Sequence, residues 1–561
     1  MISIQGRGVS SGVAMGPLYY YQRAGNVVNR VKVEDVEAEW RRFEAARGKA
    51  VDQLGELAEK ARGEVGDEAA TLFETHRWMA EDPDFEEAVE GLIKEGRLNA
   101  EAAVADAAAR LEDALARADD AYMQARAADV KDVSGRIIGI LTGAARGGID
   151  SPVPVILASD ELSPSEVVQL DRSKILGFII EGGSGSGHTA ILARDMGVPA
   201  VIGVGDRLKP EYGGREVIVD GSTGAVIVDA DAAARAAMFA RRAARLARRR
   251  RLEALKGREN VTRDGREVKV LCNIDGPGDV PTVLSNDGGG VGLFRSEYLF
   301  LSRPDDPSED CQFEVYKRVL SDMGGREVVI RTLDIGGDKR IDRLSMPVAE
   351  SRAPRVCLNR PEILKTQLRA LYRASAFGRL GILFPMVTGV WEVREARKLC
   401  EQVRRELAGE GRPFADDVRI GIMIETPAAA VMSDRLAGLA DFFSCGTNDL
   451  TQYTLACDRQ SGDPGRFFDP RHPAVLRLLK MVCDNAHSRG VPVGICGELG
   501  ADLDLTETFL SIGIDALSVS PGCVLPLRRR IREITLADVR EKILADLLGD
   551  GEAECKSAPA G

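Results

Sequence analysis

Eight short apolar runs alternate with helical stretches through the C-terminal half of the chain, and no other feature restricts the fold as much. The runs cover residues 268–274, 291–295, 328–333, 382–387, 420–425, 442–446, 491–496 and 514–519. Strands that are buried on both faces are continuous apolar segments, and eight of them alternating with helices favour a (βα)8 barrel. The sequence therefore predicts an α/β fold with a TIM-type barrel over residues 261–540.

Polar residues lie in or just after the last positions of these runs, where each strand is expected to end. They are Asn273, Arg295, Glu297, Arg331, Asp334, Glu425, Asn448, Asp449, Cys496 and Glu498. Barrel enzymes carry their catalytic groups at the C-terminal ends of the strands, whereas a structural protein has little reason to gather charge there. We therefore predict an active site at this rim.

Glu425 and Asp449 follow neighbouring strands of the predicted barrel, with no His or Cys pair nearby. Two such carboxylates suit a hard, oxygen-preferring ion, Mg²⁺ above all. Arg295, Arg331 and Arg459 would surround that ion with positive charge, and arginine binds phosphate and carboxylate bidentately. The pattern predicts a small substrate with a phosphate and a carboxylate. The alternative, ion pairs that only hold the rim together, explains single pairs but not the whole ring.

Cys496 ends the seventh apolar run. A buried cysteine is commonly a small apolar filler of the core. At this rim, however, its thiol could donate a proton to a carbanion formed near the metal. The residue pattern leaves both interpretations open.

A glycine-rich loop in the N-terminal half carries one histidine, His188. The loop follows an apolar run at 175–180 and leads into a helical pattern at 190–193. A strand, a glycine loop and a helix start form a phosphate-receiving geometry, because free backbone N–H groups and the positive helix end favour anionic oxygens. His188 could itself accept a phosphoryl group there. The alternative is a histidine that caps or packs at the helix start.

Composition divides the chain into further parts. Trp40, Phe43 and Leu54 recur at helical spacing in a segment rich in Ala, Glu and Arg, which indicates a helical bundle inserted into an α/β domain. The predicted parts are an α/β domain of residues 1–25 and 144–230, an inserted bundle of 26–143, a linker helix over 231–260, the barrel of 261–540, and a partly disordered tail of 541–561.

Charge and cysteine content exclude some classes of function. The formal net charge of −12 argues against nucleic acid as the main partner. The arginine run at 248–251 is more typical of a solvated linker helix than of a nucleic-acid or membrane site, because apolar residues around it are sparse. No apolar run approaches the length of a membrane span. Ten cysteines without paired spacing, and no signal peptide, predict reduced thiols and a cytoplasmic protein.

Several segments resemble the phosphoenolpyruvate-utilising enzymes. The histidine loop is similar to their first signature, and the segment that contains Asn448 and Asp449 is similar to their second. The matching barrel segments are 292–297, 331–339, 373–378 and 441–453, together with Asp458 and Arg459. The resemblance runs from residue 1 to about 540, and its order and length are similar to Enzyme I of the bacterial sugar phosphotransferase system.

This resemblance implies a barrel that binds phosphoenolpyruvate and a swivelling phosphohistidine domain. Phosphoenolpyruvate would bind with Mg²⁺, pass its phosphoryl group to the histidine and leave as pyruvate. The histidine of the small carrier protein HPr would then receive the phosphate, which is the first step of sugar uptake. The implied residues are Glu425 and Asp449 for the metal, Arg331, Arg352, Asn448, Asp449 and Arg459 for the substrate, and His188 and Cys496 for catalysis.

The resemblance also implies two protein partners. HPr would dock on the inserted helical domain, whose acidic segment at 81–87 favours a basic partner. The family is usually dimeric through the barrel, which implies a homodimer. No nucleic acid and no membrane insertion are expected.

Two places depart from the family pattern. Ser186 and Gly187 precede His188 where the family has Thr-Ser. After the third barrel strand, the loop that carries a phosphate-binding arginine in the family is shorter here, and Arg352 is the best positional candidate, with Arg355 second. Losing such a clamp would slow the reaction about a hundredfold, so we expect an active but slow enzyme. The alternative is a regulatory relative that binds HPr or phosphoenolpyruvate.

Overall fold

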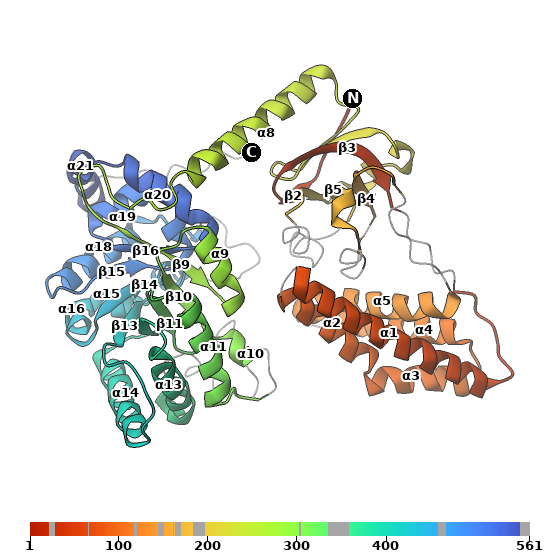
Figure 1. The fold of residues 1–561 in the computed structure, drawn as a ribbon, viewed down its shortest axis with the longest axis horizontal. Coiled ribbons are helices and arrows are strands. Elements are labelled where there is room, and N and C mark those ends of the chain that lie inside the picture. Colours follow the sequence, from red (N-terminus) through yellow and green to blue (C-terminus); the bar gives the residue numbers. More distant parts are fainter. Residues whose placement is uncertain are drawn as a thin grey trace. The chain divides into compact units, whose positions relative to one another are not determined.

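The chain divides into two compact units, Met1–Ala247 and Arg248–Gly561 (Figure 1). The computed structural model describes residues 1–21, 28–64, 67–116, 121–143, 151–160, 162, 166, 170–182, 197–301, 305–334, 358–457 and 467–549. Within these ranges, no helix combines the length and the apolar character that a membrane crossing requires.

The first unit is built on an eight-stranded mixed sheet in the order β1-β8-β7-β3-β4-β5-β6-β2. Its strands are β1 (Ile2–Gln5), β2 (Arg7–Ser10), β3 (Val13–Tyr20), β4 (Val155–Ser159), β5 (Ile175–Ile180), β6 (Ala200–Ile202), β7 (Glu216–Asp220) and β8 (Ala225–Val228). Neighbours from β3 to β6 are parallel, and the other pairs are antiparallel. All five residues of β4 are buried, because Val155 and Leu157 pack in one core and Ile156 and Ala158 in another.

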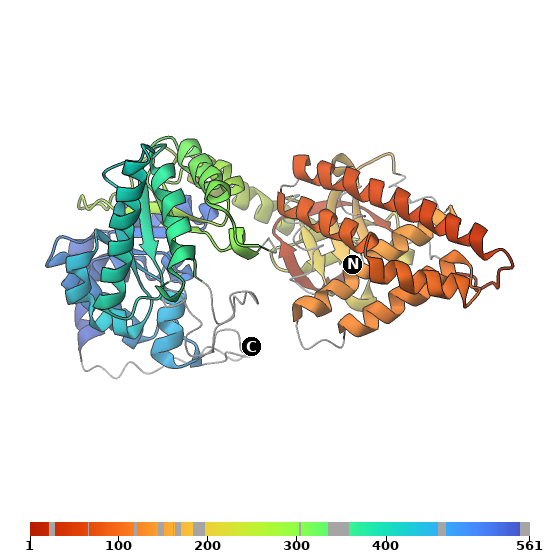
Figure 2. The same ribbon diagram turned by 90° about the horizontal axis from the view of Figure 1, so that it is seen from below.

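The described residues between β3 and β4 form five helices. They are α1 (Val36–Glu64), α2 (Asp67–Ala80), α3 (Pro83–Lys94), α4 (Ala100–Ala116) and α5 (Ala121–Thr142). Figure 2 shows the long helices side by side in a bundle. Phe43, Leu54 and Phe73 are fully buried in a core that also includes Val155 and Leu157 of the sheet. The predicted fold, a helical bundle inserted into an α/β sheet, is confirmed.

The second unit is a closed barrel of eight strands, all parallel. The strands are β9 (Lys269–Ile274), β10 (Val291–Arg295), β11 (Val328–Arg331), β12 (Leu380–Phe384), β13 (Arg419–Ile424), β14 (Phe442–Cys445), β15 (Val493–Ile495) and β16 (Ala516–Val519). The helices of eight or more residues are α11 (Glu309–Asp322), α13 (Pro361–Ser375), α14 (Val390–Gly409), α17 (Thr447–Leu455), α18 (Pro473–His487), α20 (Val524–Glu533) and α21 (Leu536–Leu548). The predicted TIM-type barrel is therefore confirmed.

A small apolar core fills the inside of this barrel. Its members are Leu293, Val329, Leu383, Met423, Phe442 and Cys496, which come from different strands or strand ends. The Phe442 ring occupies the space beside Gly421, where an added Cβ would lie 2.2 Å from the ring. Glycine at 421 is therefore required by the close approach of the aromatic ring from the neighbouring strand, β14.

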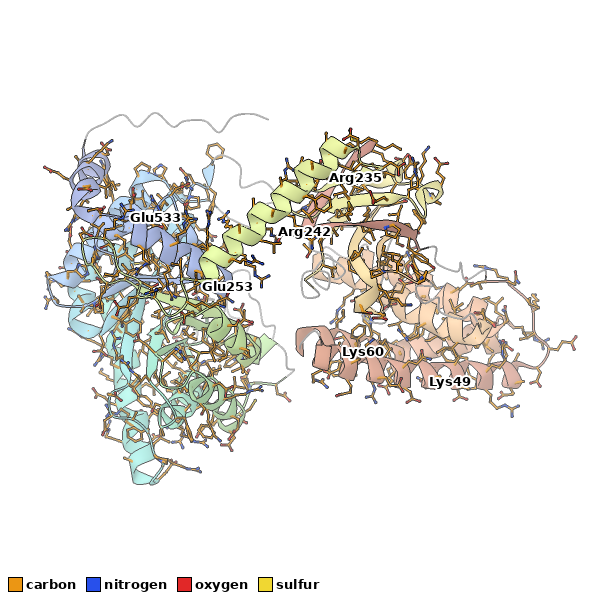
Figure 3. All side chains as sticks on the ribbon, turned by 45° about the horizontal axis from the view of Figure 1, so that its top comes forward. Lys49, Lys60, Arg235, Arg242, Glu253 and Glu533 are labelled. Carbon is orange, nitrogen blue, oxygen red and sulfur yellow. The ribbon has the colours of Figure 1, made fainter. Side chains whose placement is uncertain are left out.

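The linker helix α8 (Ala232–Glu253) has a separate attachment toward each of its ends. Met238 is buried against Ile218 and Ala230 of the first unit. Beyond the helix, Arg528 of the barrel donates to the carbonyl oxygen of Leu255 (2.9 Å). Figure 3 shows Arg235 and Arg242 along α8 and Glu253 at its end. The helix thus covers less of the chain than the segment 231–260 that the sequence predicts.

Several other boundaries differ from the sequence prediction, and two of them have a clear cause. The fourth barrel strand ends at Phe384 rather than at 387, because Pro385 follows and cannot donate a strand hydrogen bond. The boundary expected at residue 540 falls inside α21, whose Leu536 and Leu547 are buried in the barrel core. Of the tail predicted over 541–561, residues 550–561 lie outside the described residues.

We expect Gly421→Ala to destabilise the barrel by about 1–3 kcal/mol, because the new methyl group would overlap the Phe442 ring. Gly409→Ala is the control, since nothing lies within 4 Å of a Cβ built at that helical position. Calorimetric melting of the full chain measures both variants. Equal melting temperatures would contradict the overlap.

Candidate active site at the barrel mouth

The C-terminal ends of the barrel strands surround a cavity of about 870 Å³. Its polar lining residues are Arg295, Arg331, Asp334, Glu425, Asn448, Asp449, Cys496, Glu498 and Asp502. These come from separate βα units, so the closed barrel brings together residues that are far apart in the chain. A cavity of this size accommodates a small molecule at the end of a barrel where such enzymes carry their sites.

Glu425 lies at the end of β13, and its two carboxylate oxygens have different surroundings. Oε1 accepts a hydrogen bond from the backbone N–H of Met386 (2.6 Å). Oε2 lies against Gly446, where an added Cβ would come within 2.7 Å of it. Gly446 directly precedes α17, which carries Asp449 in its first turn. A side chain at position 446 would therefore displace the Glu425 carboxylate, which explains the glycine at this position.

Arg331 is held at the end of β11 between two carboxylates. It is buried, its Nη2 donates to Glu297 Oε1 (2.9 Å), and its Nη1 lies 3.1 Å from Asp334 Oδ2. The N–H of Asp334 also donates to Glu297 Oε1 (3.1 Å). Burial lowers the pKa of Arg331, but the negative charges of Glu297, Asp334 and Glu425 outweigh it and raise that pKa above its ordinary value. Arg331 is therefore a fixed positive charge beside the cavity.

Glu425 carries a large electrostatic cost in this position. Burial, together with the charge of Asp334, raises the pKa of Glu425 to about 8, although the charge of Arg331 acts in the opposite direction. Asp449 is near enough that its charge also raises the pKa of Glu425. Among the described residues that line the cavity, these acidic groups outnumber the arginines. The mouth therefore favours a bound cation.

The donor chemistry at Glu425 and Asp449 fits Mg²⁺. Within the described ranges, no three His, Cys, Asp or Glu residues are grouped as a complete metal site. Mg²⁺ does not need one, since it binds one or two protein carboxylates and completes its shell with water and substrate oxygens. Glu425 lines the cavity, and among the described residues its hydrogen bond is accepted by Oε1 and not by Oε2, which is consistent with that mode of binding.

Cys496 is at once part of the apolar barrel interior and of the cavity wall. Its Sγ donates to the carbonyl oxygen of Cys445 (3.5 Å). Burial raises the pKa of the Cys496 thiol to about 11, against smaller opposing effects of Ser444 and Arg331. The thiol is therefore protonated at neutral pH, as a proton donor must be. The two interpretations of this residue are compatible, because it packs on one side and faces the cavity on the other.

Asn448 and Arg295 complete the described part of the rim. Asn448 accepts from the N–H of Glu498 at Oδ1 (3.2 Å), and its Nδ2 lies 3.5 Å from Glu498 Oε1. Arg295 pairs with Asp275 across 2.9 Å. Arg295 and Arg331 therefore have two functions at the rim. They line the cavity, and their ion pairs connect neighbouring parts of the rim.

Four predicted site residues lie outside the described residues: His188, Arg352, its alternative Arg355, and Arg459. His188 belongs to the crossover between β5 and β6, which are parallel neighbours in the sheet. The start of that crossover is attached at Glu181, whose N–H donates to Ser159 (3.0 Å) and whose carboxylate accepts from the Tyr20 hydroxyl. The roles of these four residues stay predictions.

Sequence reasoning placed Glu297 and Asp334 at strand ends but gave them no role. Strand register is the signal that could have predicted the ion pair between Glu297 and Arg331. Arg295 is paired with Arg331 on the neighbouring strand, so Glu297, two residues later, lies close to Arg331. Met386 was missed altogether. The φ of Met386 is in the left-handed region. Methionine does not favour that region, so no local sequence pattern indicates that this residue would donate to Glu425.

Comparisons with known proteins match three family models to this chain. Residues 249–536 match "PEP-utilising enzyme, PEP-binding domain", residues 5–126 match "PEP-utilising enzyme, N-terminal", and residues 151–224 match "PEP-utilising enzyme, mobile domain". Three relatives bear the name phosphoenolpyruvate-protein phosphotransferase. They come from Priestia megaterium (40% identity, 96% of this chain, 95% of the relative), Staphylococcus carnosus strain TM300 (37%, 96%, 95%) and Bacillus subtilis strain 168 (37%, 97%, 97%).

The chain belongs to the phosphoenolpyruvate-protein phosphotransferase family. The resemblance expected from the sequence is thereby confirmed. The segment that matches the PEP-binding domain of this family includes all eight barrel strands and the residues of the cavity. The segment that matches its mobile domain includes strands β4 to β7 and position 188.

We expect Cys496 to resist alkylation at neutral pH. With a pKa of about 11, only about one thiol in a thousand is ionised at pH 8, and the thiolate is the reactive form. Iodoacetamide labelling of the native chain at pH 7 to 10, followed by peptide mass mapping, measures the rate at each cysteine. Cys311, which is partly exposed, is the internal control. Faster labelling of Cys496 than of Cys311 at pH 7 would contradict a protonated buried thiol.

Proposed function

We propose that this protein transfers the phosphoryl group of phosphoenolpyruvate to its own His188 and then to the histidine of the carrier protein HPr. One observation carries the proposal most directly. The family's PEP-binding segment contains a cavity in which an acidic pair, Glu425 and Asp449, lies beside a buried arginine, Arg331. This arrangement suits a doubly anionic substrate that is bound together with a divalent cation.

The barrel mouth would bind and orient phosphoenolpyruvate. Glu425 and Asp449 would hold Mg²⁺, which when bound offsets the charge of the phosphoryl oxygens. Arg331 would contact an anionic group of the substrate, since it is already fixed by Glu297 and does not have to be ordered on binding. Asn448, Arg459 and Arg352 would supply the remaining contacts.

His188 would act as the nucleophile. One ring nitrogen of the neutral imidazole attacks phosphorus, the bond from phosphorus to the enol oxygen breaks, and the enolate of pyruvate leaves. Such a transfer depends mainly on positioning and on charge neutralisation around the phosphoryl group. The fixed guanidinium of Arg331 contributes to both.

Cys496 would complete the first half of the reaction. Its thiol gives a proton to the methylene carbon of the enolate, which yields pyruvate and a thiolate that solvent protonates again. Burial keeps the proton on the sulfur until an acceptor arrives. The nearby charges of Arg331 and Arg295 favour the thiolate that forms, because they act against the effect of burial.

The phosphate on His188 would pass to HPr, which we expect to dock on the inserted helical bundle. The acidic segment at its surface is partly engaged within the bundle. Asp82 caps α3 by accepting from the N–H of Asp84 (2.8 Å), and Glu86 pairs with Arg47 across 2.7 Å. Asp84 and Glu87 stay exposed and are available to a basic partner.

Two further expectations belong to this proposal. The protein would form a homodimer through its barrel, which light scattering of the purified chain tests. It would also work in the cytoplasm, where thiols stay reduced. The eight described cysteines, which are all free thiols, are consistent with that compartment.

We expect wild-type protein to acquire label from ³²P-phosphoenolpyruvate in the presence of Mg²⁺. The label should be labile in acid and stable in base, as a phosphohistidine is, and His188→Ala should acquire none. Release of labelled phosphate to added HPr measures the second step. If the wild type stays unlabelled while still binding HPr, a regulatory role replaces the catalytic one.

We expect Asp449→Asn to slow labelling by about a hundredfold, because it removes a carboxylate from the proposed cation site. The matched control is Asp502→Asn. Asp502 lines the same cavity, but its carboxylate is paired with Arg471 across 2.5 Å. Rates of labelling over a range of Mg²⁺ concentrations compare the two variants. Similar rates for both would contradict a specific role of Asp449.

A further inference from the structure

Met386, at the barrel rim, has a backbone conformation that L-amino acids avoid. It lies two residues after β12, and its φ of 51° is in the left-handed region. There the Cβ atom crowds the neighbouring backbone, so bulky residues other than glycine are uncommon. Such strain persists only where the surroundings impose it, and it gathers at functional sites. Met386 is nearly buried, at 8% exposure, so the conformation belongs to the packed protein and not to a loose loop.

The strained conformation directs one hydrogen bond at the proposed active site. The N–H of Met386 donates to Glu425 Oε1 at 2.6 Å, within the buried part of the rim. The other oxygen of Glu425, Oε2, lies on the opposite side against Gly446. A freely rotating carboxylate would exchange its two oxygens. Here one oxygen has a backbone donor, so the orientation of the carboxylate is fixed.

The chain on both sides of Met386 is held in place. Upstream, Phe384 is buried in the barrel strand, and Pro385 has a fixed φ. Downstream, the carbonyl oxygen of Val387 accepts from the Thr426 hydroxyl at 2.8 Å. Because its neighbours are fixed, the change in chain direction after β12 is made by the left-handed backbone of Met386.

A second attachment holds the end of the loop of residues 385–389. Glu392 is buried, and its Oε2 accepts from the N–H groups of Thr388 (2.6 Å) and Gly389 (2.9 Å). Thr426 also caps α15 (Pro427–Val431) by accepting from the N–H of Ala429 (3.1 Å). Thr426 directly follows Glu425 in the chain. One threonine therefore ties the loop to the same strand end that carries the carboxylate.

We propose that residues 385–389 form a positioning device for Glu425, in which the left-handed backbone of Met386 turns its N–H to Oε1 and so leaves Oε2 for the cation. The inference rests on the magnesium site of the proposed function. Met386 and Thr426 act through Glu425, since neither residue lines the cavity. The loop orders a metal ligand in advance, as the partners of ligating side chains generally do.

Thr426→Val tests the attachment, because valine keeps the shape of threonine and loses the hydroxyl. We expect it to weaken Mn²⁺ binding to the full chain about tenfold, measured by electron paramagnetic resonance in the absence of turnover. Thr426→Ser, which keeps the hydroxyl, should stay within about twofold of wild type. Ser433→Ala is the matched control, since it removes a buried hydroxyl of the same βα unit that bonds Ala430 and Asn485 instead of the loop.

Met386→Gly and Met386→Ala test the strain itself. Both remove the methionine side chain, and only glycine adopts the left-handed region without penalty. Glycine ordinarily gives a less stable protein than alanine, because its unfolded chain has more freedom. At position 386 we expect the reverse, with the metal-free glycine variant melting at the higher temperature. A higher melting temperature for the alanine variant would overturn the inference.

The outcomes separate this inference from the function on which it rests. Mn²⁺ binding that Thr426→Val leaves unchanged, or that Ser433→Ala weakens equally, would overturn the positioning role while the metal site stands. A wild-type chain that binds no Mn²⁺ with phosphoenolpyruvate present would overturn the metal site, and the inference with it. Weakening by Thr426→Val alone, restored by Thr426→Ser, supports the device.

Discussion

Buried negative charge at the barrel mouth is the constraint on which the rest of the site depends. Asp334, Glu425 and Asp449 are each at most 8% exposed, and Arg331 is the cation buried among them in the described chain. A carboxylate taken out of water without a partner is costly, so such a cluster needs a proton or a cation to be stable. The same deficit of positive charge favours a cation at the barrel mouth.

A closed parallel barrel can bear that cost because each strand has two hydrogen-bonded neighbours. The strand ends therefore stay in place when like charges are brought together. Below the charged layer, the apolar side chains of Leu293 and Met423 pack with Cys496 and form an apolar floor of the cavity. A thiol at the boundary between the two layers is buried enough to hold its proton and close enough to the cavity to release it. The position of Cys496 thus follows from the layered packing of the barrel.

The sequence predicts most of the fold because burial on both faces leaves a direct trace, the eight apolar runs. It also predicts that Glu425 and Asp449 converge, since both follow adjacent parallel strands, β13 and β14. It does not predict which partner each charge takes. The Glu297 clamp on Arg331 depends on strand register, and the donor from Met386 depends on a backbone angle imposed by distant attachments. Local residue preferences carry neither kind of information.

A phosphoryl relay also requires the histidine domain to move relative to the barrel. The packing of the linker helix α8 indicates where the chain bends at the lowest cost. Met238 packs α8 into the core of the first unit, and Arg528 fastens Leu255 to the barrel. Between them, the arginine run at 248–251 is exposed on every side. Like charges three residues apart repel on a helix, and no tertiary packing compensates in this stretch. A change of direction between a histidine domain and a barrel therefore costs least there, where the helix has no core contact to lose.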